Sequence, residues 1–446
     1  MNLVGTKTFK GGVHPQDGKK LSCDCPITRL APKGELIYLM TQHIGAPAKP
    51  IVSVGDRVLL GQTIAQAGGF VSADICASVS GTVKKIAAVP NTNGDEVTAV
   101  FVENDCEYEA VEGYGDYRDY SLMSKDEIRA AVKNAGLVGM GGAGFPTSVK
   151  LSVKDDTAID YVLVNGAECE PYITCDYRLM IERTEKAVLG LKILLRLFDN
   201  AKGVFAIENN KPEGIKCLKE AIGSSQRMYV QPLKKKYPQG GERMIISAVT
   251  GRKINSKKLP ADAGCVVINY ATLLAVADAV AYNMPLTQRV ITVTGDAIST
   301  PANFEVPIGM SARELVEAAG GFTQDPEKVV FGGPMMGGSV SGIDTPVTKT
   351  TSCILCFKQD DVAALHPSAC IRCGKCLEAC PEQLMPMKLK NHADAYEYDE
   401  FEKAGGLECI GCGSCTYICP ARRRLSQSIS VAKRHVLAEK KKKGVK

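Results

Sequence analysis

A cysteine pattern near the C-terminal end constrains this 446-residue chain more than any other feature. The run Cys370-x2-Cys373-x2-Cys376-x3-Cys380-Pro381 recurs as Cys409-x2-Cys412-x2-Cys415-x3-Cys419-Pro420. Three thiolates at this spacing bind three irons of one cubane, and the fourth cysteine of each run reaches the other cluster. The pattern therefore predicts two [4Fe–4S] clusters. One is expected to use Cys370, Cys373, Cys376 and Cys419, and the other Cys409, Cys412, Cys415 and Cys380.

Two structural zinc sites are the alternative for these cysteines, but zinc ligands come as separated pairs rather than as an evenly spaced triplet. Residues 381–408, between the two runs, are rich in helix-forming residues. We therefore expect a helical two-cluster ferredoxin domain over residues 346–425, rather than the compact β type. Such a pair of clusters carries single electrons and binds no substrate of its own.

The net charge of +5 is unevenly distributed along the chain. Residues 422–446 hold ten Lys or Arg and one Glu, so the remaining 421 residues carry a net charge of about −4. This distribution disfavours a nucleic-acid-binding body. We expect a basic tail over residues 426–446, which is either solvated or faces anionic lipid or an acidic electron-transfer partner.

Membrane insertion and secretion are disfavoured by two stretches of the sequence. Residues 1–20 lack the apolar core of a signal peptide. The most apolar stretch, 263–281, contains Asn269, Thr272 and Asp278, which suit a buried strand and helix better than a membrane span. We expect no transmembrane segment and a reducing compartment, where clustered cysteines bind metal rather than form disulfides.

The region over residues 1–120 is predicted to be β-structured. Short Val/Ile runs at 50–66 and 75–87 are interrupted by Gly-Asp and Ser-Gly pairs. These Gly-punctuated hairpins resemble the barrel-sandwich domain of biotinyl and lipoyl carriers. The modified lysine of those carriers has no counterpart at 73–80, so a docking module is favoured over a carrier.

Two further regions follow. Residues 121–287 alternate apolar strands and amphipathic helices, which predicts an α/β domain with a mostly parallel sheet. Its first helix is expected after a capping box of Ser124 and Glu127, and one long helix is expected over 178–198. Residues 288–345 return to short strands around one helix, which suggests a small β-grasp domain.

Four polar segments of the α/β region fall in loops or at strand ends. The run 139–147 (GMGGAGFPT), with Lys150 shortly after it, lets backbone N–H groups and a cation approach a phosphate or a flat ring. Residues 165–171 (NGAECEP) follow a predicted strand directly, where open α/β sheets bind ligands. Residues 237–242 precede a helix, and residues 269–272 follow another strand. Taken singly, each segment is also consistent with an ordinary loop or helix cap.

In their order and intervals, these four segments resemble those of the flavin- and NADH-binding subunit of respiratory complex I. With the run 11–15 (GGVHP), the barrel-sandwich and β-grasp regions and the paired cysteine runs, the resemblance extends to the C subunits of bacterial Rnf ferredoxin:NAD oxidoreductase complexes. It implies an FMN cradle formed by Gly139, Gly141, Lys150, Asn165, Tyr237, Gly240, Asn269 and Thr272, and Gly142 is a further expected cofactor-binding residue.

The resemblance also implies an NAD(H) site. Phe145 is expected to stack on the nicotinamide nucleotide, and Glu168 and Glu170 are expected to face it. The complex I subunit has Arg at the position of Met140, Asp at that of Ala167 and Glu at that of Gly241. The resemblance is therefore closer for the FMN contacts than for the NAD(H) contacts.

The implied function is electron transfer in an ion-pumping ferredoxin:NAD+ oxidoreductase. FMN links hydride exchange with NAD(H) to the single-electron clusters, and no side chain is required as a catalytic acid or base. The implied partners are the membrane and iron–sulfur subunits of the complex and, indirectly, ferredoxin. The implied location is the cytoplasmic face of the bacterial membrane.

Three alternatives differ in one testable feature each. A flavin and iron–sulfur cobalamin reductase would lack the long barrel-sandwich region. The A subunit of the Na+-translocating NADH:quinone reductase would lack the ferredoxin motifs. A non-catalytic iron–sulfur docking scaffold would bind no flavin.

The remaining cysteines and histidines are expected to be structural. Cys353-x2-Cys356 has no second pair nearby and is expected to be an ordinary thiol pair, although a redox or metal role is an alternative. Cys23 and Cys25 alternate along an extended segment, and His14 and His43 are isolated.

Overall fold

Residues 161–269 form a four-stranded parallel sheet with the order β11-β10-β9-β12. The computed structural model describes residues 5–340 and 342–443 of the chain. The strands are β9 (Tyr161–Gly166), β10 (Lys202–Glu208), β11 (Met228–Leu233) and β12 (Cys265–Asn269). The chain proceeds outward from β9 to β11 and then returns to the other side of β9 for β12. The winding therefore reverses between β9 and β12, and such reversals leave a crevice at the carboxyl ends of the strands.

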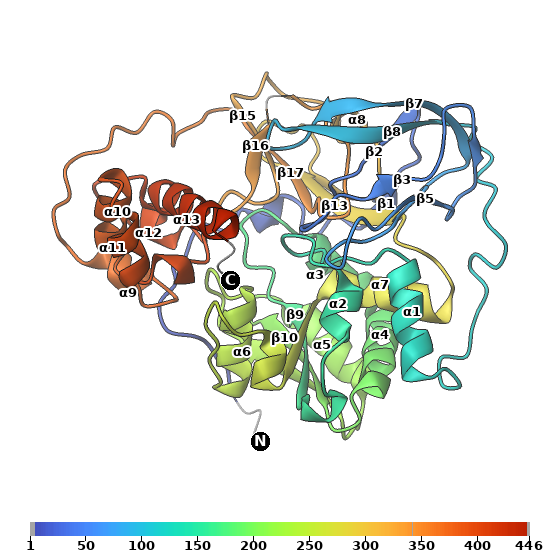
Figure 1. Cartoon of the computed structure of the whole chain (residues 1–446), viewed down its shortest axis with the longest axis horizontal. Helices are drawn as coiled ribbons and strands as arrows, with labels where there is room; N and C mark the ends of the chain where they lie inside the picture. The colour runs from blue at the N-terminus through green and yellow to red at the C-terminus, as the bar shows by residue number, and fades with distance from the viewer. Residues whose placement is uncertain (1–4, 341, 444–446) are drawn as a thin grey trace.

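Helices cover both faces of this sheet (Figure 1). On one face, α6 (Glu242–Thr250) packs Ile245 and Val249 against β9 and β12. The other face is covered by α1 (Lys125–Asn134), α2 (Thr147–Leu151), α3 (Cys175–Glu182), α4 (Thr184–Leu197), α5 (Pro212–Ile222) and α7 (Tyr270–Ala281). The predicted α/β domain is therefore confirmed as a helix–sheet–helix arrangement.

The local predictions for this domain have different outcomes. The capping box that opens α1 is confirmed, because Ser124 and Glu127 bond to each other's backbone N–H. The single helix expected over 178–198 is wrong, because the chain breaks at Arg183, whose φ is −136°. The Arg183 guanidinium bonds Glu305 in a neighbouring strand at 2.7 Å, which stabilises the break between α3 and α4.

The barrel-sandwich domain packs two small sheets around a common core that includes Tyr38, Ile64, Val83 and Val100. One sheet has the order β2-β8-β7-β4, with β2 (Glu35–Leu39), β8 (Glu96–Asn104), β7 (Gly81–Pro90) and β4 (Arg57–Val58). The other has the order β3-β5-β6, with β3 (Lys49–Pro50), β5 (Thr63–Gln66) and β6 (Ile75–Cys76).

A six-stranded sheet forms the β-grasp region and draws strands from outside residues 288–345. In spatial order it contains β1 (Ile27–Arg29), β14 (Ala302–Pro307), β13 (Gln288–Thr294), β17 (Cys353–Phe357), β15 (Lys328–Phe331) and β16 (Gly338–Val340), and α8 (Ala312–Ala318) packs on it. The structure thus differs from the expected domain limits at both ends. The strand β13 is apolar on both sides, and its two edges are satisfied by β14 and by β17. Cys353 and Cys356 lie in β17 with their side chains in two different cores.

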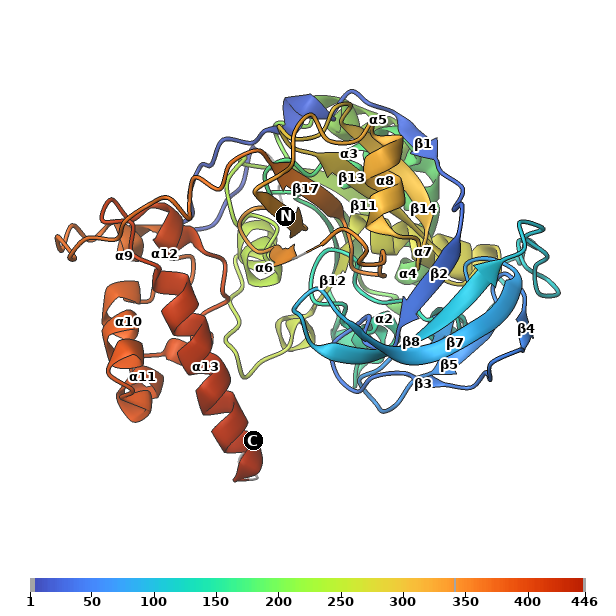
Figure 2. The ribbon, with the colours of Figure 1, turned by 90° about the horizontal axis from the view of Figure 1, so that it is seen from above.

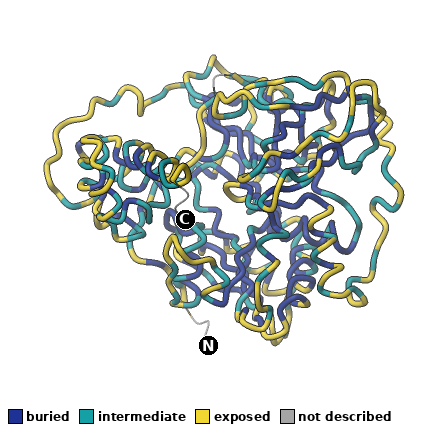
Figure 3. Tube along the Cα trace, viewed as in Figure 1, coloured by how far each residue is buried: buried dark blue, intermediate teal, exposed yellow. Residues whose placement is uncertain are grey.

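The ferredoxin domain is helical and stands beside the rest of the molecule (Figures 1 and 2). It contains α9 (Lys375–Ala379), α10 (Pro386–Asp394), α11 (Tyr398–Lys403), α12 (Ser414–Tyr417) and α13 (Leu425–Lys442). The exposed residues 361–369 connect it to β17 (Figure 3). Among the described residues, no helix combines the length and apolar character of a membrane span.

The basic tail expected over residues 426–446 differs from the structure. Most of it is α13, which packs Ile429, Ala432 and Val436 against Leu389 and Phe401 of the ferredoxin domain. The apolar positions recur at helical spacing between the basic residues, so one face of α13 packs on the domain while Arg434 and Lys441 to Lys443 stay exposed. Residues 444–446 lie outside the described residues.

Candidate cofactor sites

Two asparagines lie at the carboxyl ends of β9 and β12, the edge of the sheet where the reversal of the winding is expected to leave a crevice. Asn165, near the end of β9, donates from Nδ2 to the carbonyl oxygen of Gly240 at 2.8 Å. Asn269, at the end of β12, accepts the N–H of Thr272 at 3.1 Å and thereby caps α7. Its Nδ2 donates to Asp176 at 2.7 Å. The crevice therefore brings three of the four predicted segments together, since residues 165, 240 and 269 all lie at this edge of the sheet.

The fourth segment, the glycine loop 139–147, lies over the same crevice. The N–H of Met140 donates to Thr272 Oγ1 at 2.9 Å. A Cβ atom on Gly141 would lie 2.7 Å from Asn269 Nδ2, whereas a Cβ on Gly142 would have no neighbour within 4 Å. The loop is thus held against the strand ends at Gly141 and is open at Gly142. Backbone that is both anchored and open in this way fits a flat or phosphorylated ligand.

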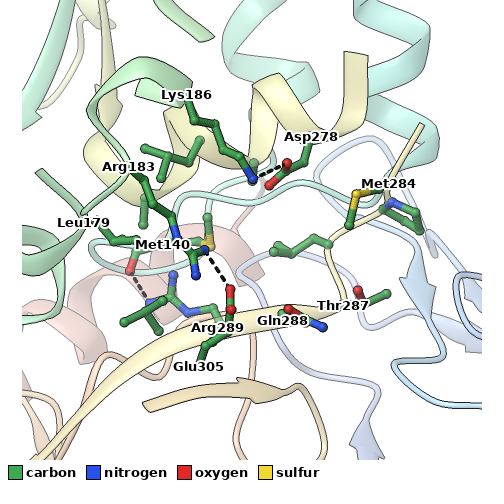
Figure 4. Close-up of a pocket in the computed structure, with 16 residues that line it drawn as sticks. Met140, Leu179, Arg183, Lys186, Asp278, Met284, Thr287, Gln288, Arg289 and Glu305 are labelled. Carbon is green, nitrogen blue, oxygen red and sulfur yellow. Dashed lines mark hydrogen bonds and ion pairs between the residues drawn. The ribbon is translucent and has the colours of Figure 1, made fainter. Parts of the chain in front are cut away.

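A cavity of about 100 Å³ lies behind the glycine loop, with Met140 in its lining (Figure 4). Its charged groups are paired, Arg183 with Glu305 and Lys186 with Asp278, both at 2.7 Å. Buried Arg289 donates to the carbonyl oxygen of Met140 at 3.3 Å. We interpret this cavity as support for the loop, because its cations are already engaged by acids and carbonyl groups.

The other predicted cradle residues have protein partners of their own. Lys150 Nζ lies 2.7 Å from Glu242 and 2.9 Å from the carbonyl oxygen of Val267. In the segment 237–242, the side chain of Gln239 is buried, and its Nε2 has no hydrogen-bond partner. An unpaired buried donor is costly, so it indicates a ligand atom or a water. The anchored, open backbone at Gly141 and Gly142 is the feature that fits a bound FMN.

The residues expected to face NAD(H) lie partly inside the protein. Phe145 is half-buried, and its carbonyl oxygen accepts the N–H of Gly139 at 2.8 Å. Glu168 is buried, accepts the N–H of Asp176 at 2.8 Å and pairs with Lys19 at 3.4 Å. Burial and the Glu168 charge raise the pKa of Asp176 to about 6. Asp176 and Lys19 are parts of this site that sequence reasoning missed, because neither lies in a glycine-rich or strand-end motif.

Glu170 is enclosed by the loop that follows β15. Its Oε2 accepts the N–H of Met335 at 3.1 Å, and its Oε1 has no partner. Burial raises the pKa of Glu170 to about 7, because the backbone donors offset only part of the lost solvation. The group therefore titrates near neutral pH.

A pH dependence of stability follows from Glu170. Below about pH 4 the carboxyl is protonated in both the folded and the unfolded state. Between the ordinary pKa of 4.5 and the folded-state pKa of about 7, the carboxyl is ionised in the unfolded state only, so a rising pH favours unfolding. We expect the free energy of unfolding to fall by about 2–3 kcal/mol as the pH rises from 5 to 8. Glu170→Gln should flatten this dependence in chemical denaturation, and the exposed Glu220→Gln should not. Equal slopes for both variants would contradict this assignment.

The eight cysteines of the repeated motif line two separate pockets. Cys370, Cys373, Cys376 and Cys419 surround one pocket, the outer cysteine pocket. Cys380, Cys409, Cys412 and Cys415 surround another, the inner cysteine pocket. Each pocket contains three cysteines of one run and the last cysteine of the other, which is the grouping that the spacing predicts. No three such side chains of the described residues converge closely enough to hold a single metal ion.

The two pockets are built by the same backbone conformation. Gly374 and Gly413 have φ values of 77° and 76° and precede the short helices α9 and α12. Arg372 and Gly411, one residue before the second cysteine of each run, have φ values of 55° and 70°. The repeated turn presents three thiols of each run to one pocket, as a cubane cluster requires.

The two pockets differ in depth. Cys370 and Cys373 of the outer pocket are exposed, whereas Cys380 and Cys412 of the inner pocket are buried. The inner pocket faces the α/β domain, since the hydroxyl of Tyr237 donates to the carbonyl oxygen of Cys412 at 2.7 Å. From α13, Lys433 donates to the carbonyl oxygen of Cys409 at 2.7 Å. The inner pocket therefore adjoins the α/β domain, whereas two cysteines of the outer pocket are exposed.

Arg243 of α6 fastens the ferredoxin domain to the α/β domain. Its guanidinium pairs with Glu408 at 3.0 Å and with Glu382 at 3.3 Å, and all three side chains are largely buried. We expect Arg243→Ala to lower the free energy of unfolding by about 1–3 kcal/mol, because two carboxylates lose their charged donor. Arg313→Ala, which breaks an exposed pair with Asp344, should cause a much smaller loss. Thermal denaturation of both variants tests this prediction. Equal losses of stability would contradict a role of Arg243 in holding the two domains together.

Comparison with protein families supports this arrangement along the chain. Residues 132–278 match the Nuo51 FMN-binding domain, and residues 369–432 match a 4Fe-4S dicluster domain. Residues 7–107 match the RnfC barrel sandwich hybrid domain, and residues 290–338 match the SLBB domain. The fold and the site thus define a flavin- and iron–sulfur-binding electron-transfer protein.

Relatives over nearly the full length narrow this class. The chain is 44% identical to the C subunit of the Na+-translocating ferredoxin:NAD+ oxidoreductase complex of Acetobacterium woodii, over 98% of each chain. It is also 44% identical to the C subunit of the proton-translocating complex of Clostridium ljungdahlii, over 86% of this chain and 84% of that one. The protein belongs to the family of C subunits of ion-translocating ferredoxin:NAD+ oxidoreductase complexes. The predicted family and fold class are confirmed.

A solved structure shares part of this fold. A chain of an NAD+-reducing [NiFe]-hydrogenase in the H2-reduced state superimposes with a TM-score of 0.50 at 19% identity. The match covers 72% of this chain and 62% of that chain. Because the identity is low, the likeness concerns the fold alone.

Proposed function

We propose that this chain is the NAD(H)-linked electron-transfer subunit of an ion-pumping ferredoxin:NAD+ oxidoreductase. The observation that carries the proposal is the contact between the α/β domain and the inner pocket, where the Tyr237 hydroxyl donates to the carbonyl oxygen of Cys412 at 2.7 Å. The near-full-length relatives, which are named as C subunits of such complexes, support it. FMN, when bound, supplies the chemistry that links two-electron hydride exchange to single-electron clusters.

The chain's own residues would hold the cofactors as follows. The glycine loop would hold FMN by its backbone at Gly142, and the two asparagines would fix the crevice around it. The cysteines of each pocket would bind one [4Fe–4S] cluster in the cross-exchanged grouping. NAD(H) would bind and exchange hydride at the open side of the glycine loop, near Phe145. The residues proposed for the FMN site are Gly139, Gly141, Gly142, Lys150, Asn165, Tyr237, Gly240, Asn269 and Thr272.

We further propose that the chain works at the cytoplasmic face of the membrane, bound to membrane and iron–sulfur subunits. The relatives' names describe complexes that translocate Na+ or H+, which supports such an assembly. The exposed cysteines at the outer pocket support entry of electrons from a partner on that side. Ferredoxin would then donate indirectly, and the ion would be moved by other subunits.

The proposal is tested on the chain reconstituted anaerobically with iron, sulfide and FMN. We expect two [4Fe–4S] clusters and one acid-released flavin per chain, and NADH oxidation with a one-electron dye as acceptor. Protein reconstituted without FMN is the control and should keep its clusters but lose the NADH activity. Clusters without any bound flavin would favour the docking scaffold instead.

A further inference from the structure

The segment 11–13, part of the GGVHP run near the N-terminus, lies far from the barrel-sandwich domain with which it is contiguous in sequence. The N–H of Val13 donates to the carbonyl oxygen of Tyr237 at 2.8 Å, and the N–H of Tyr237 returns a bond to Val13 at 2.9 Å. One residue earlier, the N–H of Gly12 donates to the carbonyl oxygen of Ala379 at 2.9 Å. The segment is therefore bonded on one side to the crevice loop and on the other to the residue before Cys380.

Both glycines are packed too closely for any side chain. Gly11 and Gly12 have φ values of +89° and +86°. A Cβ on Gly11 would lie 2.7 Å from the carbonyl oxygen of Cys380, and a Cβ on Gly12 would lie 2.6 Å from that of Tyr237. Since each glycine contacts the backbone of a different domain, a side chain at either position would push the inner pocket away from the crevice.

The segment is also anchored before and beyond these contacts. Lys7 forms a parallel β-bridge with Leu233, the last residue of the edge strand β11. The N–H of Lys234 donates to the carbonyl oxygen of Lys7 at 2.8 Å. Val13 and Tyr237 are buried in one apolar cluster with Ala379 and Cys412. The segment is thus a fixed part of the α/β domain that reaches into the ferredoxin domain.

We propose that Gly11–Val13 is a positioning clip that sets the separation between the FMN crevice and the inner cluster. The proposal rests on the proposed function, since it takes the crevice as the FMN site and Cys380 and Cys412 as cluster ligands. Tyr237 completes the clip, because its backbone bonds Val13 and its hydroxyl bonds Cys412. FMN, when bound, would exchange single electrons with the inner cluster across the clip, toward the cluster when NADH is the donor and toward the flavin when ferredoxin is the donor. The rate of this step depends on the distance that the clip maintains.

The test uses the full reconstituted chain with Gly12→Ala, and Gly5→Ala as its matched control. Gly5 has a similar φ of +87° but no atom within 4 Å of a Cβ position. Stopped-flow absorbance separates reduction of the flavin by NADH from the later reduction of the clusters. We expect Gly12→Ala to keep its iron, its FMN and its rate of flavin reduction, and to reduce the clusters about 10-fold or more slowly. Gly5→Ala should match the wild type in both phases.

Tyr237→Phe is a second variant, and it tests the positioning role if Gly12→Ala does not retain iron. It removes one hydroxyl and leaves the backbone bonds to Val13 intact. We expect a shifted midpoint potential and EPR spectrum of the inner cluster, with the outer cluster unchanged, because hydrogen bonds near the ligands tune such clusters. Wild-type cluster reduction in Gly12→Ala, or wild-type rate and spectrum in Tyr237→Phe, would overturn the proposal. Failure of the wild-type chain itself to pass electrons from NADH to its clusters would refute the proposed function instead.

Discussion

Replacement of Cys419 by serine is expected to remove the cluster of the first cysteine run rather than that of its own run. Cys419 lies in the second motif of the sequence but lines the outer pocket with Cys370, Cys373 and Cys376. The variant should lose half of the bound iron and all electron transfer through the outer pocket. Serine at a ligand position does not supply the thiolate that binds the cluster.

Serine variants of two cysteines from each pocket test this grouping. Cys419→Ser and Cys370→Ser should each lose the EPR signal of the outer cluster. Cys380→Ser and Cys409→Ser should each lose the signal of the inner cluster. Cys353→Ser, at a buried thiol in β17 outside both pockets, is the control and should keep both signals. Grouping of Cys419 with Cys409 would contradict the exchange of ligands between the two runs.

The second large effect concerns Gly142. Its position in the glycine loop has no protein atom within 4 Å of a Cβ, so alanine should leave the cofactor-free fold unchanged. If FMN approaches the loop there, the added methyl occupies its space and should weaken FMN binding by about 1–3 kcal/mol.

Gly34→Ala is the matched control, because Gly34 also lacks neighbours within 4 Å and has no positive φ. The measurements are the dissociation constant of FMN by fluorescence quenching and the denaturation midpoint of the cofactor-free protein. An unchanged FMN affinity in Gly142→Ala would remove the glycine loop from the FMN site.

The elements that short-range patterns specify could be predicted from the sequence. The capping box of Ser124 and Glu127 depends on neighbouring residues alone, and it is confirmed. The grouping of the cysteines could also be predicted, since three ligands of each pocket lie within seven residues of one another. The fold class followed from the alternation of strands and helices and is confirmed.

Features that depend on distant parts of the chain could not be predicted. The break at Arg183 needs Glu305, which is 122 residues away. The strands β1 and β17 pair with β14 and β13 through backbone hydrogen bonds, and no local pattern indicates which segments supply these partners. The charge count over 422–446 suggested a tail, whereas the apolar spacing within the same residues allows α13 to pack. The GGVHP run was visible as a motif, but its contacts with Tyr237 and Ala379 appear only in three dimensions.

The central claim is that one chain connects NAD(H) to two clusters through a flavin. The most direct measurement is an anaerobic titration of the reconstituted chain with NADH, followed by cluster absorbance at about 400 nm. We predict that NADH bleaches the clusters in the FMN-loaded chain and leaves them oxidised in the chain without FMN. Clusters that stay oxidised although FMN is bound and NADH is in excess would contradict the account.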